Sequence, residues 1–249
     1  MPQDSNFCIT HRVEMATIKS PFSEDLLYFC VECGKEMDEE LKREEESREQ
    51  AQRDEAVRLI RQSCQIGKRF ESATFENYQP CNANSLAIHG VCSAYADTFS
   101  EHANKDGGGL LLLGKPGTGK NHLSAAICNH IMDHQFSTLH TTVLKLVRRI
   151  KNTWSKDSNE SETEAIKFFR LPDLLVIDEV GVQFGSQAEQ LLLTEVINDR
   201  YEWMRPTILI SNLTTEQLSE VLGERIIDRF RENGKLLVFD WMSYRSNKK

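Results

Sequence analysis

From residue 67 onward, short and continuously apolar runs alternate with longer amphipathic stretches. The apolar runs predict strands at 109–114, 138–143, 171–180, 206–212 and 235–241. The amphipathic stretches predict helices at 121–134, 141–156, 189–202 and 216–231. Strands that are apolar throughout are typical of a parallel sheet with helices on both faces. We therefore predict an α/β fold for residues 67–249.

The pattern before residue 67 is different and divides the chain into three parts. Residues 37–66 are highly charged, contain no Gly or Pro, and are rich in good helix formers. They predict an exposed helical arm; the alternative for this composition is a disordered acidic linker. Residues 1–36 show little periodicity but hold closely spaced Cys and His. The predicted organisation is a small module (1–36), an arm (37–66) and the α/β domain (67–249).

Composition restricts the classes of function. The chain has 249 residues, of which 39% are hydrophobic, with a net charge of −8. Residues 1–66 hold 15 of the 38 acidic and 9 of the 30 basic side chains. A generally basic nucleic-acid surface is therefore excluded, and any such contact must come from a local patch. No apolar run approaches the roughly 20 residues of a membrane span, and no signal peptide is evident. We expect a cytoplasmic protein whose Cys residues are thiols or metal ligands.

A phosphate-binding pattern lies between the first of these strands and its helix. The segment GKPGTGK has the spacing and the strand–helix context that this motif requires. Backbone N–H groups and the positive helix end would bind phosphates. The residues concerned are Gly114, Lys115, Pro116, Gly117, Thr118, Gly119 and Lys120. Asn121 then stands where the pattern normally has Ser or Thr to hold magnesium.

Polar residues at the ends of later strands complete this candidate site. Asp178 is expected to hold Mg²⁺ and Glu179 to polarise the attacking water, although two acids at a strand end can also form a plain solvated turn. Asn212 ends the next strand and can orient the water. Arg225 and Arg229 share one helix face, which suits an arginine acting on a neighbouring subunit. An ordinary solvated helix face is the alternative.

Together these residues resemble AAA+ ATPases, and among them the DnaC-type replicative helicase loaders. The IstB-type transposition helper ATPases are close relatives. The similarity lies in FENY (75–78), GKPGTGKNHLSAAICN (114–129), LLVIDEVGVQ (174–183), LGERIIDRFR (222–231) and WMSYRS (241–246). The loader family typically has Asn at the position of Asn121, so the resemblance argues against a broken site. We expect ATP and Mg²⁺ as ligands and slow hydrolysis, with the nucleotide acting mainly as a switch.

The resemblance also implies roles for single residues and an assembly. Asn212 corresponds to the first sensor, Arg229 to the arginine finger, Arg225 to its neighbour and Arg245 to the second sensor. Family members lack the full helical lid domain of many AAA+ proteins. A neighbouring subunit then completes the nucleotide site, which implies an open spiral of subunits on a DnaB-type hexameric helicase.

Residues 141–156 carry five basic residues and no acid. Helical spacing places an apolar face at Leu144, Val147 and Ile150. We expect contacts to single-stranded DNA, with basic side chains on phosphates and an aromatic ring stacked on a base, from Lys145, Arg148, Arg149, Lys151 and Trp154. The alternative is a surface helix whose Trp packs in the core. Its position after the second strand matches the DNA-binding helix of loaders.

The N-terminal module carries a metal-ligand pattern. Cys8-x2-His11 and Cys30-x2-Cys33 are separated by 18 residues, which suits tetrahedral Zn²⁺. Scattered core cysteines are the alternative. Loaders usually carry a helical N-terminal domain instead, so the family's helicase-binding residues cannot be carried over. The acidic surroundings favour a protein partner for this module.

These patterns favour one function and leave two alternatives. The first is an ATP-dependent loader that delivers a hexameric helicase to single-stranded DNA. The second is a transposition helper ATPase that acts on duplex DNA. The third is a zinc-dependent interaction adaptor with a dormant ATPase core, against which Lys120, Asp178, Glu179 and Arg229 speak.

Overall fold

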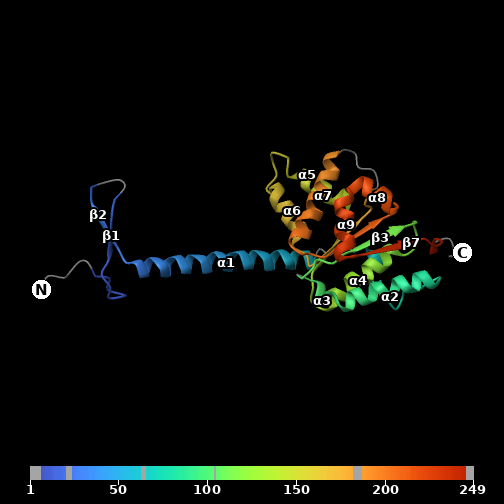
Figure 1. The fold of residues 1–249 in the computed structure, drawn as a ribbon, viewed down its shortest axis with the longest axis horizontal. Helices are drawn as coiled ribbons and strands as arrows, with labels where there is room; N and C mark the ends of the chain where they lie inside the picture. The colour runs from blue at the N-terminus through green and yellow to red at the C-terminus, as the bar shows by residue number, and fades with distance from the viewer. Residues whose placement is uncertain (1–6, 21–23, 63–65, 104, 182–186, 245–249) are drawn as a thin grey trace. The chain divides into compact units, whose positions relative to one another are not determined.

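The computed structural model of the chain describes residues 7–20, 24–62, 66–103, 105–181 and 187–244. The chain forms two compact units, residues 1–55 and 56–249 (Figure 1). The division falls within one long helix, so each unit is described by itself.

The first unit consists of a β-hairpin and a helix. Strands β1 (Ala16–Lys19) and β2 (Leu26–Phe29) pair antiparallel, and α1 runs over Val31–Gln62. Exposed ion pairs one turn apart, Glu32–Lys35 at 2.9 Å and Glu39–Arg43 at 3.4 Å, support its first turns. The helix extends over most of the predicted arm (37–66), but it begins earlier, at Val31. Cys30 therefore directly precedes the helix and Cys33 lies on its first turn.

The second unit is built on a parallel sheet of five strands in the order β4-β5-β6-β3-β7. The strands are β3 (Leu110–Gly114), β4 (Thr138–Thr142), β5 (Leu174–Asp178), β6 (Thr207–Ser211) and β7 (Lys235–Phe239). All five predicted strands are confirmed. Four are one or two residues shorter than their apolar runs, and the fifth, predicted at 171–180, is limited to Leu174–Asp178.

Helices cover both faces of this sheet (Figure 1). They are the short 3-10 helix η1 (Lys68–Phe70), α2 (Ala83–Asp97), α3 (Phe99–His102), α4 (Lys120–Asp133), α5 (Val143–Asn152), α6 (Glu162–Arg170), α7 (Gln187–Glu202), α8 (Thr215–Leu222) and α9 (Glu224–Asn233). Along β3, Leu110 and Leu112 face the core shared with α2 and α4. Leu111 and Leu113 face the core shared with α5 to α9. The predicted α/β fold is confirmed.

One helix prediction was wrong in detail. The expected helix at 216–231 is divided into α8 and α9 at Gly223, whose φ of 84° favours glycine. The break places Arg225 in the first turn of a new helix, so Arg225 and Arg229 still share one face of α9.

Candidate nucleotide and metal sites

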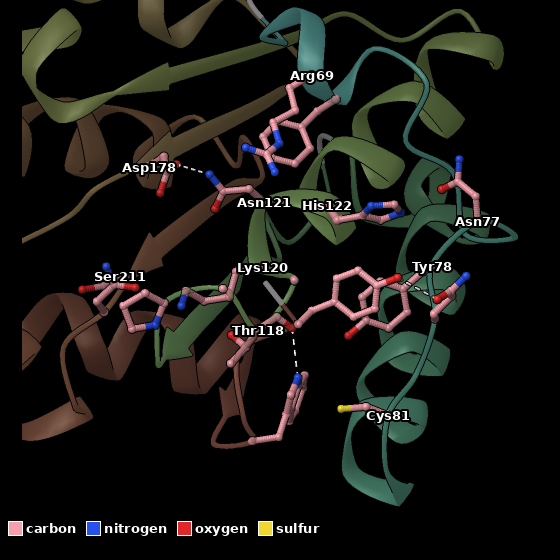
Figure 2. A pocket seen from close by; sticks show the side chains of 18 of the residues that line it. Arg69, Asn77, Tyr78, Cys81, Thr118, Lys120, Asn121, His122, Asp178 and Ser211 are labelled. Carbon is pink, nitrogen blue, oxygen red and sulfur yellow. Dashed lines mark hydrogen bonds between the residues drawn. The ribbon is translucent and has the colours of Figure 1, made fainter. Parts of the chain in front are cut away.

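A cavity of about 900 Å³ lies at the carboxyl ends of β3, β5 and β6 (Figure 2). Its floor is the loop between β3 and α4. Gly117 and Gly119 have φ of 78° and 100°, and a Cβ at Gly119 would come within 2.7 Å of the Tyr78 ring. Glycine is therefore required there both by the backbone conformation and by space. The loop conforms to the predicted phosphate-binding turn.

Lys120 lies at the start of α4 and is almost fully buried. Its Nζ donates to the carbonyl oxygens of Gly114 at 2.6 Å and Lys115 at 2.8 Å. Burial lowers the pKa of this ammonium group to about 8, against the attraction of Asp178. Phosphate oxygens entering the cavity would offer Lys120 stronger, charge-assisted partners than these two carbonyls.

The acidic end of β5 faces the same cavity. Asp178 Oδ2 accepts a hydrogen bond from Asn121 Nδ2 at 2.5 Å, and its Oδ1 accepts the Glu179 N–H at 2.7 Å. Glu179 has a φ of 62°, an unfavourable conformation for a residue with a side chain, of the kind that clusters at functional sites. Its exposed side chain lines the cavity, as does Asn212 after β6. The structure thus brings Lys120, Asn121, Asp178, Glu179 and Asn212 together as predicted.

This donor set fits a magnesium ion. Mg²⁺ prefers oxygen ligands, usually one or two carboxylates together with phosphate oxygens and water. Asp178 has a lone pair left on each oxygen after its two hydrogen bonds, and the amide oxygen of Asn121 accepts no hydrogen bond from the described residues. These two residues would hold the ion, which would neutralise charge on the phosphates.

The far end of the cavity was not predicted. The tail after β7 and the strap at residues 69–81 meet there. Trp241 Nε1 donates to Thr118 O at 3.0 Å, and the Tyr244 hydroxyl donates to Gln79 Oε1 at 2.8 Å. Tyr78 lies beside them against the phosphate loop. This aromatic end is suited to a nucleotide base; the only signal in the sequence was the similarity of FENY and WMSYRS.

The predicted arginines lie elsewhere. Neither Arg225 nor Arg229 is among the described residues that line the cavity. Arg225 is exposed, whereas Arg229 donates to Asn198 Oδ1 and stacks 4.0 Å over the Tyr201 ring, both on α7. Arg245 lies outside the described residues.

The basic helix α5 is confirmed as a surface helix, but its faces differ from the prediction. The buried side chains are Val143, Leu146, Val147 and Ile150. Leu144 was wrongly placed on the apolar face: it is 61% exposed. Lys145 and Arg148 are exposed on α5, as the prediction of a DNA contact requires.

Two of the predicted DNA-binding cations are partly engaged within the chain. Arg149 pairs with Glu160 at 2.6 Å and Lys151 with Glu189 at 2.7 Å. Trp154 is 55% exposed just after the helix, and its Nε1 donates to Glu162. Its ring is therefore not packed in the core, in contrast to the alternative considered above.

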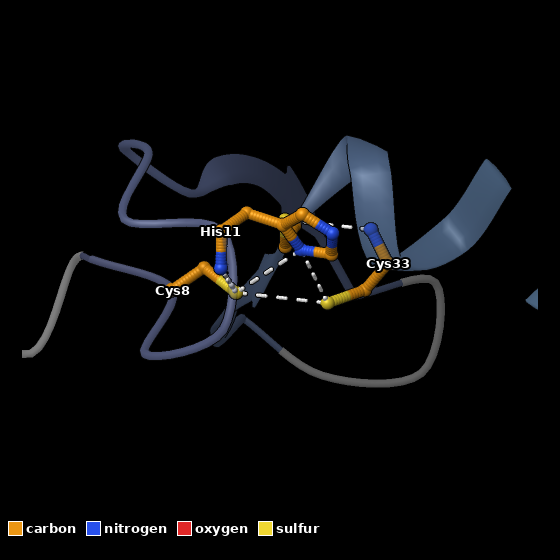
Figure 3. Close-up of side chains that lie close together, drawn as sticks. Cys8, His11 and Cys33 are labelled. Carbon is orange, nitrogen blue, oxygen red and sulfur yellow. Dashed lines mark hydrogen bonds between the residues drawn. The ribbon is translucent and has the colours of Figure 1, made fainter. Parts of the chain in front are cut away.

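In the first unit, the four predicted metal ligands converge (Figure 3). His11 Nδ1 lies 3.8 Å from Cys8 Sγ, 3.6 Å from Cys30 Sγ and 3.3 Å from Cys33 Sγ, and the sulfurs of Cys8 and Cys33 are 3.6 Å apart. Tetrahedral zinc, with bonds of about 2.3 Å to sulfur and about 2.0 Å to nitrogen, requires edges of about 3.5–3.8 Å. The donor set and its spacing fit Zn²⁺.

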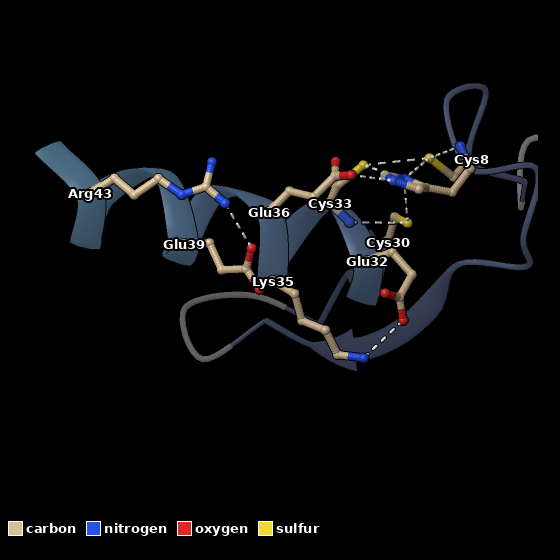
Figure 4. A network of polar contacts seen from close by, with 9 residues as sticks. Cys8, Cys30, Glu32, Cys33, Lys35, Glu36, Glu39 and Arg43 are labelled. Carbon is tan, nitrogen blue, oxygen red and sulfur yellow. Dashed lines mark hydrogen bonds and ion pairs between the residues drawn. The ribbon is translucent and has the colours of Figure 1, made fainter.

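Polar contacts around this cluster orient its ligands (Figure 4). Glu36 accepts from His11 Nε2 at 3.0 Å, which leaves Nδ1 on the side of the three sulfurs. The same contact raises the pKa of His11 to about 9, so zinc would displace a proton from this ring. Hydrogen bonds from His11 lower the pKa of Cys8 to about 6, so its thiolate is favoured. The backbone N–H groups of His11 and Cys33 point to the sulfurs of Cys8 and Cys30 at 3.5 Å.

Among the residues with a described conformation, none of the helices has the length and apolar character needed to cross a membrane.

Comparisons with known proteins also indicate an ATP-binding protein. A family model described as IstB-like ATP binding protein matches residues 37–249. The replicative helicase loader DnaC of Buchnera aphidicola subsp. Acyrthosiphon pisum (strain APS) is 34% identical over 239 residues, covering 94% of this chain and 92% of that protein. The replicative helicase loader DnaC of Escherichia coli (strain K12) is 36% identical over 178 residues, covering 71% and 70%.

A solved structure shows the same fold. The crystal structure of the DnaC helicase loader superimposes with a TM-score of 0.62 at 24% identity, covering 70% of this chain and 99% of that chain. The α/β domain thus matches nearly the whole of that solved structure.

Proposed function

The chain belongs to the family of IstB-like ATP-binding proteins, and we propose that it is an ATP-dependent loader of a hexameric replicative helicase onto single-stranded DNA. The carrying observation is an intact phosphate-loop cavity, with Lys120, Asp178 and Glu179 in place, in a chain that aligns along 94% of its length with a named helicase loader. The chain is accordingly an AAA+ ATPase. As a loader it would act in the cytoplasm.

ATP is proposed to act as a switch that is hydrolysed slowly. Asn121 replaces the hydroxyl that normally ligates magnesium, and its amide is engaged with Asp178. We expect turnover below about 1 per second, the low end for ordinary enzymes. A much faster turnover of the chain alone or bound to helicase and DNA would contradict this part of the proposal.

A second copy is proposed to complete the site. Arg225 and Arg229 on α9 lie outside the cavity of their own chain, so they are available to a neighbouring one. Arg229 is held by Asn198 and the Tyr201 ring, which fixes its guanidinium at the α7–α9 surface. Successive copies arranged in this way would form a spiral bridged by ATP.

The exposed side of α5 is the proposed contact with single-stranded DNA. Lys145 and Arg148 are exposed there, and the Trp154 ring lies just beyond the helix. Arg149 and Lys151 keep acidic partners, so they contribute less than the sequence suggested. Phosphate contacts of this kind make binding salt-dependent, and ring stacking makes it tolerant of sequence.

The first unit is a proposed zinc module that binds the protein partner. Its helix is acidic from Glu32 onward, which disfavours DNA as its ligand. A unit this small has too little core to be stable without a cross-link, so metal binding and its folding are coupled.

We expect one zinc ion per chain and its loss in Cys30→Ser. Removing one of three thiolates leaves an incomplete tetrahedral set. Native mass spectrometry of the full chain measures the stoichiometry, with Cys81→Ser as the control because Cys81 is exposed and outside the cluster. A wild-type chain without zinc, or a Cys30→Ser chain that retains it at full occupancy, would remove the zinc assignment.

The loading function is tested by helicase transfer to a circular single strand. With ATP, the chain is expected to deliver a hexameric helicase that unwinds an annealed oligonucleotide, and without the chain unwinding is expected to be slow. If the chain instead assembles with ATP on duplex DNA and leaves helicase activity unchanged, the transposition-helper function is favoured.

A further inference from the structure

We propose that one face of the β1–β2 hairpin is a docking surface for a protein helix that has an apolar side flanked by basic residues. This hairpin face consists of Ala16, Ile18, Leu27 and Phe29. The inference rests on the proposed role of the first unit in binding a protein partner. It adds the surface that makes the contact and the chemistry of the segment that the surface accepts.

The pairing register of the hairpin gathers these four side chains on one side. Residues directly opposite each other in an antiparallel pair share a face, and successive pairs alternate between the two faces. Ala16 pairs with Phe29, and Ile18 pairs with Leu27 two positions further along. The hairpin face is therefore apolar throughout.

The hairpin face is open to solvent. Ile18, Leu27 and Phe29 are 55%, 50% and 45% exposed. A two-stranded hairpin normally needs a helix or further strands against one face to be stable. Here two metal ligands precede β1 and two follow β2, so a bound zinc ion would hold the open end of the hairpin together without covering its face. An apolar face left uncovered in this way indicates an interaction site.

The charge of the first unit selects the class of partner. Residues 1–55 hold 15 acidic and 7 basic side chains, whereas residues 56–249 hold 23 of each, so this unit carries the net charge of −8. The exposed acids Glu32, Glu36 and Glu39 lie on the first turns of α1, which follows directly after β2 (Figure 4). Like charges repel, so a nucleic acid, an anionic membrane and a second copy of this unit are disfavoured. A basic protein segment is favoured.

The dimensions of the hairpin face favour a helix as the docked element. Its two strands have four residues each, so the face is about 13 Å long, with the strands about 4.8 Å apart. One helix about 10 Å across can cover such a face over two to three turns. A docked strand would instead pair with the backbone at an edge of the hairpin and leave the apolar face exposed. Basic side chains beside the apolar side of the helix would reach the acids at the start of α1.

The test measures binding of a labelled synthetic peptide to the zinc-loaded full chain by fluorescence anisotropy. The peptide has about 18 residues, all Leu or Lys, spaced so that Leu occupies one side of a helix. One control peptide has Glu in place of Lys, and the other has the same composition without helical spacing. The wild type is expected to bind the first peptide at least about tenfold more tightly than either control, and more weakly as salt is added.

The combined substitution Ile18→Ser and Leu27→Ser is expected to weaken binding of the Leu/Lys peptide at least about tenfold, because it removes two apolar contacts from the centre of the face. Neither residue is a metal ligand, so native mass spectrometry should still find the wild-type zinc content. If zinc is lost, Ile18→Ala with Leu27→Ala takes its place, with a several-fold weakening expected. Leu86→Ser is the matched control: Leu86 is 59% exposed but lies on α2 of the second unit, and its variant should bind like the wild type.

The outcomes separate this inference from the wider function. Unchanged affinity in a zinc-bound double variant would overturn the hairpin face as the docking surface, and so would equal binding of the Leu/Glu peptide. Dimers that the wild type forms and the double variant does not would assign the face to a second copy instead. If the peptide binds as expected but no complex with a hexameric helicase forms, only the loading function fails. If that complex forms and is unchanged in the double variant, only the hairpin face fails.

Discussion

Replacing Lys120 by Ala is expected to weaken ATP binding about 30–150-fold. The substitution removes the ammonium group that would contact phosphate oxygens, and hydrogen bonds to charged groups contribute about 2–3 kcal/mol. Fluorescence titration with a labelled nucleotide measures the change. The fold should be retained, because a buried charge that now bonds only to two carbonyls is removed.

Lys167→Ala is the matched control, since this exposed lysine on α6 lies away from the cavity. Its nucleotide affinity should match that of the wild type. An affinity of Lys120→Ala within about threefold of the wild type would mean that the loop does not bind phosphate as described.

Replacing Arg200 by Met is expected to cost about 3–5 kcal/mol of the free energy of unfolding. Arg200 is fully buried, and burial lowers its pKa to about 9. Its guanidinium donates to six acceptors, which are the Thr207 hydroxyl and the carbonyls of Phe169, Arg170, Pro172, Asp173 and Pro206. Methionine fills much of the volume but leaves these carbonyls buried without a donor.

Urea unfolding of the full chain measures this loss. Arg231→Met is the control, because Arg231 is exposed and its ion pair, with Asp228 one turn away at 3.0 Å, is exposed too; it should change stability by less than about 0.5 kcal/mol. Equal stabilities of the two variants would contradict the anchoring role of Arg200. The role matters for function because these carbonyls precede β5, which ends at Asp178, and β6, which Asn212 follows.

The phosphate loop could be predicted because its chemistry is local. Lys120 is placed by a continuous strand–loop–helix segment, and Asp178 is placed because parallel strands end at one edge of the sheet. The metal ligands were predictable for a similar reason, since two short Cys/His spacings specify the donor set.

The rest depends on contacts between distant parts of the chain. Tyr244 meets Gln79 across 165 residues, and neither residue type signals that pairing. Arg200 reads as a solvated position on a helix, and its burial follows only from the carbonyls gathered around it. On α5, one of the three residues predicted for the apolar face was misplaced, because Leu144 and Leu146 cannot be told apart until the helix is packed on its neighbours.

The most direct test of the loader function is the native mass of this chain mixed with a hexameric replicative helicase, with and without ATP. We predict a discrete complex of several copies per hexamer, whose composition depends on ATP in the wild type and no longer does so in Lys120→Ala. The proposed function would be contradicted if the zinc-bound chain formed no complex with any replicative helicase of its own organism, either with or without ATP.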